Sequence, residues 1–171
     1  DHLPKKRWKN FVKAGSFGDA SVFAFYPNKQ ITTGEGGLIV TDDRHIYDMC
    51  RSLRNQGRSP EGSDWFGHNQ LGYNYRISDI NCALGLSQLY RFDEIIKRRQ
   101  TIADYYRERL KTLSFIKPPF CAPHVTLGWF VYVVQLADEC KRKDRDAIMK
   151  NLRAKGVACT NYFAPIHLQP F

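Results

Sequence analysis

The clearest pattern along the chain is a pair of short apolar runs, 22–26 and 38–41, separated by a polar segment that contains three glycines. Short apolar runs bounded by glycine and proline are typical of β-strands. Pro27 ends the first run, because proline has no N–H to donate to a neighbouring strand. The pattern therefore predicts a β-hairpin, with Lys29 in the connection just after its first strand.

Three segments in the middle of the chain repeat their apolar residues at helical spacing. Residues 42–55 begin with acidic and end with basic side chains, and their apolar residues share one face. Residues 79–89 are apolar almost all round, which predicts a helix that is buried or packs on a partner subunit. Residues 91–113 carry an apolar stripe opposite a charged face. Between the first two helices, 56–77 is expected to form a long, ordered loop.

The last third of the chain alternates strand and helix patterns after a linker at 114–127. Residues 129–136 are apolar on both faces, which predicts a central strand. Residues 144–155 suit a helix that a glycine ends, and 157–162 suit a further strand. We therefore expect a small β–α–β domain at this end of the chain.

Composition and charge narrow the function classes. With 43% hydrophobic residues in 171, the chain has enough apolar material for a sizeable core. The net charge is +9, but acidic residues interleave with many of the basic ones, which favours solvated helix surface over a nucleic-acid stripe. Five widely spaced cysteines form no zinc-ligand pattern, and no metal site is expected. There is no apolar run of membrane-spanning length and no signal-peptide pattern, so we expect a cytoplasmic protein without a membrane partner.

Four blocks of sequence, in order, resemble one protein family. They are residues 15–19 (GSFGD), 25–37 (FYPNKQITTGEGG), 72–79 (GYNYRISD) and 165–171 (PIHLQPF). Together they are similar to the DegT/DnrJ/EryC1/StrS family of pyridoxal-phosphate-dependent sugar aminotransferases of fold type I. The combination is highly specific, whereas any one block would not be.

The resemblance implies an α/β fold in two parts. Residues 1–114 would form the C-terminal part of the large domain that binds pyridoxal phosphate, and 115–171 a small α+β C-terminal domain. The chain would then cover only about the C-terminal half of the family fold. The missing part supplies the aspartate that pairs with the ring nitrogen of the cofactor, a role that we do not assign to Asp1.

The candidate site residues have both a structural and a functional interpretation. On spacing alone, Lys29 is an exposed lysine at a hairpin turn; the resemblance implies that it binds pyridoxal phosphate as a Schiff base and carries the catalytic proton. Asn74 resembles an asparagine that binds the cofactor phosphate of the neighbouring subunit, or is a turn residue. Arg76 is an anion ligand or an internal clamp. His167 resembles a residue near the sugar-nucleotide pocket, or is structural; Tyr26 lines a pocket or packs in the core.

The resemblance implies an aminotransferase of nucleotide-linked keto-sugars, with glutamate or glutamine as amino donor, that acts as a homodimer in amino-sugar or cell-surface polysaccharide biosynthesis. Relatives with histidine in place of the lysine are dehydratases, and Lys29 argues against that branch. Ala24 stands where many members have a phosphate-binding serine, so we expect the chain on its own to be inactive. The alternatives are a non-catalytic fragment or interaction domain and, with least support, a basic module that binds nucleic acid.

Overall fold

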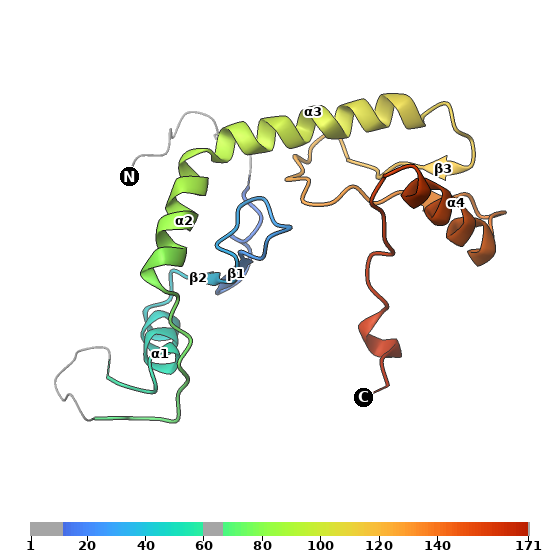
Figure 1. The fold of residues 1–171 in the computed structure, drawn as a ribbon. Coiled ribbons are helices and arrows are strands. Elements are labelled where there is room, and N and C mark those ends of the chain that lie inside the picture. The colour runs from blue at the N-terminus through green and yellow to red at the C-terminus, as the bar shows by residue number, and fades with distance from the viewer. Residues whose placement is uncertain (1–11, 60–66, 171) are drawn as a thin grey trace. The chain divides into compact units, whose positions relative to one another are not determined.

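A computed structural model describes residues 12–59 and 67–170 (Figure 1). The chain divides into two compact units, Asp1–Phe92 and Asp93–Phe171. The elements of the first unit are β1 (Ser21–Ala24), β2 (Gly37–Val40), α1 (Arg44–Arg54) and α2 (Asp79–Tyr90). Those of the second are α3 (Phe92–Leu110), which begins at the boundary, β3 (Ile116–Lys117), β4 (Gln135–Leu136), α4 (Arg142–Ala154) and the short 3₁₀ helix η2 (Ile166–Leu168).

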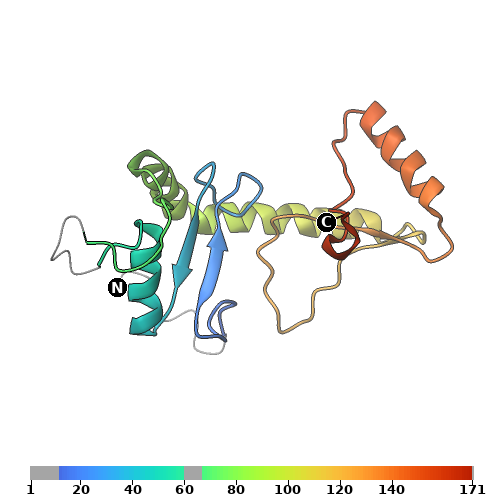
Figure 2. The same cartoon turned by 90° about the horizontal axis from the view of Figure 1, so that it is seen from below.

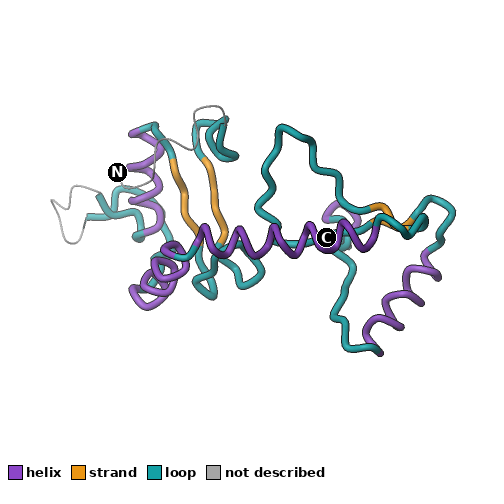
Figure 3. Tube along the Cα trace, turned by 90° about the horizontal axis from the view of Figure 1, so that it is seen from above, coloured by secondary structure: helices purple, strands orange, loops and turns teal. Residues whose placement is uncertain are grey.

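The predicted hairpin is confirmed, and each of its strands begins one residue earlier than predicted. Strands β1 and β2 are antiparallel, and Ser21 lies opposite Val40. The pairing continues one step past the strands, because the Phe25 N–H donates to the Gly36 carbonyl at 2.9 Å. Helix α1 lies alongside β2 (Figures 2 and 3). Its start is fixed by Asp43, whose carboxylate accepts from two N–H groups of the first turn.

Helix α2 packs against the connection between β1 and β2. The Ser78 hydroxyl caps its N-terminus, and the Asn81 side-chain amide donates to the Glu35 carbonyl at 3.3 Å. A Cβ atom at Gly85 would lie only 2.9 Å from the Cγ2 methyl of Thr33, a side chain that is 4% exposed. The helix therefore approaches the connection at the one position where it carries no side chain.

This contact predicts an unusual result for Gly85→Ala. In an open helix the change stabilises by about 1 kcal/mol. Here the added methyl meets the short, buried Thr33 side chain, so we expect the free energy of unfolding to fall by about 1–2 kcal/mol. Thr33→Ser removes the opposing methyl and keeps the hydroxyl. Chemical denaturation of the two single variants and the double variant measures the coupling; additive effects would contradict the packing described.

In the second unit, α3 holds an irregular segment rather than a strand. Arg99 donates from Nη1 to the carbonyls of Trp129 (2.9 Å) and Phe130 (3.3 Å). The Tyr132 ring stacks on Tyr106 with 5.2 Å between centroids. Burial raises the pKa of the Tyr132 phenol, and the nearby Arg107 acts in the opposite direction.

Two predicted strands in this unit are wrong. Of 129–136, only Gln135–Leu136 is a strand, paired with β3, and 157–162 contains none. Trp129 has a positive φ of 34°, which no regular strand contains, and Arg99 occupies the carbonyls that a ladder would use. The Cys159 carbonyl likewise accepts two bonds from the Arg153 guanidinium. The helices predicted at 91–113 and 144–155 are confirmed as α3 and α4, and both ends of each helix lie within three residues of the predicted positions.

The described residues do not form the sizeable core that the composition led us to expect. Among residues 12–59 and 67–170, Ala103 is the one apolar residue that is buried, at 2% exposure. Large apolar side chains stay exposed on the hairpin and on α2, for example Val22 and Ile80. None of the helices described is long and apolar enough to cross a membrane. In the same residues, no three His, Cys, Asp or Glu side chains gather where they could hold a metal ion.

The compact units do not coincide with the two domains expected at 1–114 and 115–171. Helix α3 runs without interruption from Phe92 to Leu110 and belongs almost wholly to the second unit. The units are defined by contacts within this chain, whereas the expected domains follow from the family resemblance. The boundary at 114/115 therefore stays a prediction.

Candidate functional site

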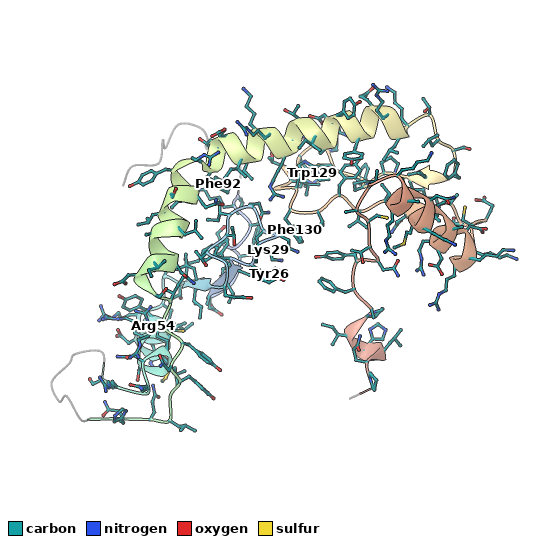
Figure 4. The ribbon with its side chains drawn as sticks, in the orientation of Figure 1. Tyr26, Lys29, Arg54, Phe92, Trp129 and Phe130 are labelled. Carbon is teal, nitrogen blue, oxygen red and sulfur yellow. The ribbon has the colours of Figure 1, made fainter. Side chains whose placement is uncertain are left out.

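Lys29 lies in a tight turn directly after β1. Its N–H donates to the Tyr26 carbonyl at 2.9 Å, which closes the turn over Pro27 and Asn28. The Lys29 side chain is half-buried and that of Tyr26 is 52% exposed. Figure 4 labels both residues at the same end of the hairpin, where the chain leaves the first strand. The turn thus carries a primary amine and, three residues before it, an aromatic ring.

The segment after Lys29 is braced by its two threonines. The Phe25 carbonyl accepts from both the Thr32 hydroxyl and the Thr33 N–H, each at 3.0 Å. The Thr32 hydroxyl also accepts from the Gly34 N–H, and the Thr33 hydroxyl donates to the Glu35 carbonyl. The two bonds to Phe25 tie the segment after the Lys29 turn to a carbonyl of the segment before it. The sequence interpretation missed this role of Thr33, for which the block TTGEGG was the available signal.

Asn74 and Arg76 lie on a second segment, residues 68–76, which returns alongside the end of α1 and is called the returning segment below. Asn74 forms an isolated antiparallel bridge with Asn55, and the Arg76 guanidinium donates to the Asn55 side-chain oxygen at 2.8 Å. Tyr73 and Tyr75 stack with 4.8 Å between ring centroids. Because alternate residues of an extended segment face opposite sides, Asn74 and Arg76 lie on the side away from this pair.

Two glycines allow the returning segment to approach α1 closely. Gly57 has a φ of +75°, and a Cβ there would lie 1.8 Å from the Gln70 carbonyl oxygen. A Cβ at Gly72 would lie 2.0 Å from the Gly57 nitrogen. The Gln70 side-chain amide donates to the hydroxyl of Ser52, which is 5% exposed. The backbone contact between these glycines thus sets the position of Asn74 and Arg76 relative to α1.

The structure groups the predicted site residues by segment. Tyr26 and Lys29 share one turn, and Asn74 and Arg76 share the returning segment; both belong to the first unit. His167 lies in η2 of the second unit and is exposed. The structure therefore brings together two pairs of the five residues.

The sequence model of the DegT/DnrJ/EryC1/StrS aminotransferase family matches residues 7–171. The GDP-perosamine synthase of Caulobacter vibrioides is 38% identical over 162 residues, which are 92% of this chain and 42% of that protein. Helicobacter pylori PseC, an aminotransferase involved in the biosynthesis of pseudoaminic acid, has a similar structure, with a TM-score of 0.84 and 28% identity over 95% of this chain and 43% of its own.

A structure of the Escherichia coli GDP-4-keto-6-deoxy-D-mannose-3-dehydratase with bound hydrated PLP also matches. Its TM-score is 0.77 and its identity 25%, over 88% of this chain and 42% of its own. The chain thus spans less than half the length of the relatives it matches. The predicted fold class is confirmed: the chain is α/β and has the fold of part of a fold-type-I, PLP-dependent sugar aminotransferase.

Proposed function

The chain belongs to the DegT/DnrJ/EryC1/StrS aminotransferase family, and from this we propose that the whole protein transfers an amino group to a nucleotide-linked keto-sugar. The observation that carries the proposal is Lys29, a half-buried amine on a turn that two threonines brace. A lysine here favours amino transfer over the dehydration named for the Escherichia coli relative. Glutamate or glutamine is the proposed amino donor.

The polar groups of this chain fit pyridoxal phosphate in part. The cofactor carries an aldehyde and a phosphate; the Lys29 amine suits the aldehyde, and the exposed Asn74 amide offers two N–H donors for the phosphate of a neighbouring subunit. The residue at position 24 is alanine and offers no hydroxyl. When bound, the cofactor supplies an electron-withdrawing ring.

The residues of the chain then have distinct roles. Lys29 would hold the cofactor through Nζ, and its amine would move a proton to and from the reacting carbon of the substrate. The bonds that Phe25 accepts from Thr32 and Thr33 keep the turn in place. This lowers the entropy cost of placing the Lys29 amine next to the reacting carbon. Tyr26 lines the pocket beside it. We assign Arg76 to the nucleotide-sugar substrate because its guanidinium can bind an anion in bidentate geometry. We assign His167 to the same substrate because it resembles a family residue near that pocket.

We further propose that the whole protein is a homodimer and that α2 contributes to its interface. Four large apolar side chains of this helix are exposed, namely Ile80, Leu84, Leu86 and Leu89. Ile80 and Leu84 lie on one side of the helix and Leu86 and Leu89 on the other, and a soluble monomer rarely leaves so many large apolar side chains of one helix exposed. Light scattering of the whole protein should give twice the subunit mass; a stable monomer would contradict this assignment, and with it the inter-subunit role of Asn74.

The experiment that tests the proposed function compares the whole protein with the 171-residue chain. Each is incubated with pyridoxal phosphate, glutamate and a nucleotide-linked keto-sugar, and the amino sugar is detected by mass spectrometry. We expect product from the whole protein and none from the chain alone, because several groups that bind the cofactor lie outside it. A whole protein that binds the cofactor and dehydrates the sugar would contradict the proposal, and turnover by the chain alone would contradict the assigned division of the site.

A further inference from the structure

A hollow of about 170 Å³ lies where the end of α1 meets the returning segment. It is lined by Arg51, Arg54, Asn55, Arg58, Ser59 and Arg76. Four of these six residues carry a guanidinium group, and no acidic residue is among the described residues that line it. The positive charges of Arg51, Arg54 and Arg76 around one small space repel each other, and a negative charge between them would relieve that repulsion.

The helix itself does not require these arginines as caps. The Ser52 carbonyl accepts from the N–H groups of Asn55 and Gly57. The carbonyls of Leu53 and Arg54 accept from the N–H groups of Tyr73 and Tyr75, at 2.6 and 2.9 Å. Because the main chain of the returning segment already satisfies the last carbonyls of α1, capping does not explain the guanidinium groups of Arg51 and Arg54.

Two of the four guanidinium groups are oriented by their contacts. Arg76 donates one bond to the Asn55 side-chain oxygen, and Arg51 lies over the Tyr47 ring, 5.4 Å from its centroid. A guanidinium has five N–H donors in a rigid fork, so a single bond leaves most of them for a ligand. Groups held in this way lose less conformational entropy when they bind.

We propose that this hollow binds a phosphate group of a small molecule, with Arg51, Arg54 and Arg58 acting together with Arg76. Guanidinium forks match phosphate oxygens in bidentate geometry. The volume is below the 300–1,000 Å³ or so of sites that enclose whole ligands, so the hollow takes the phosphate while the rest of the molecule lies outside. The proposal rests on the proposed function in one respect: the cofactor and the nucleotide-linked substrate of the proposed aminotransferase reaction both carry phosphate.

The test measures binding to the whole protein by isothermal titration calorimetry. The probes are inorganic pyrophosphate, GDP and pyridoxamine 5′-phosphate, which has no aldehyde to react with lysines. Arg54→Gln and Arg58→Gln remove one charge each from the hollow. Arg44→Gln is the matched control, because it removes the same charge from the same helix but pairs with Asp48 outside the lining. Circular dichroism and the unfolding midpoint check that each variant is folded.

We expect both hollow variants to weaken pyrophosphate binding by at least about tenfold, since a charged hydrogen bond is lost, and the control to change it by less than about twofold. Parallel loss for GDP assigns the site to the nucleotide substrate, and parallel loss for pyridoxamine phosphate assigns it to the cofactor. Unchanged affinity for all three probes, or an equal loss in Arg44→Gln, would overturn the proposal. Pyrophosphate binding through these arginines in a protein that forms no amino sugar would refute the proposed function alone.

Discussion

Lys29→Ala is expected to abolish amino-sugar formation by the whole protein, with a loss of at least about 10³-fold. On the proposed assignment, the change removes both the amine that binds the cofactor and the base that moves the proton, so two contributions disappear together. Lys29→Arg should be equally inactive, because a guanidinium keeps the charge but does not react with the aldehyde. The rate of product formation under saturating cofactor measures both variants.

The matched control is Lys150→Ala, which removes an exposed lysine from α4. It should keep wild-type activity. Activity above about one hundredth of wild type in Lys29→Ala would mean that another amine of the protein serves the cofactor. Because Lys29 is only half-buried, we expect the variant to keep its unfolding midpoint within a few degrees, which separates loss of chemistry from loss of fold.

Gly57→Ala is expected to have the largest effect on stability, lowering the free energy of unfolding by about 2–5 kcal/mol. Gly57 has a positive φ, and its new Cβ would lie 1.8 Å from the Gln70 carbonyl oxygen, a backbone atom that moves only with its segment. The segment that bears Asn74 and Arg76 must then move away from α1. Chemical denaturation of the whole protein measures the loss.

Gly156→Ala is the control that separates backbone strain from the steric clash with the Gln70 carbonyl as causes of the loss in stability. Gly156 has a similar φ of +79°, but a Cβ there meets no atom within 4 Å. This control should lose only the cost of backbone strain, about 1 kcal/mol. Equal losses in the two variants would show that strain alone is responsible, and that the close approach of Gly57 to the returning segment does not hold the site in place.

Local signals in the sequence account for the parts of the fold that were predicted. Pro27 and the glycines after it mark the hairpin, and the side chains of Asp43 and Ser78 cap α1 and α2 as such residues commonly do. Each of these signals acts within a few residues. They were therefore sufficient to place the strands and helices of the first unit, and to place Lys29 just after a strand.

Contacts between distant segments could not be predicted from the sequence. The close approach of Gly57 and Gly72, the packing of Thr33 on Gly85 and the arginine-lined hollow each depend on how two segments meet. The apolar run at 129–136 has the composition of a strand, but Arg99 takes its carbonyls and the ladder does not form. Many large apolar side chains among the described residues also stay exposed, which the composition does not show.

The most direct test of the central claim is to locate the cofactor on the protein. The whole protein is incubated with pyridoxal phosphate, reduced with borohydride, digested and analysed by peptide mass spectrometry. If Lys29 holds the cofactor, a single pyridoxyl adduct appears on the peptide that contains Tyr26 and Lys29, at about one per subunit, and glutamate added before reduction diminishes it. Label spread over several surface lysines, or concentrated on a peptide that lacks Lys29, would contradict the account.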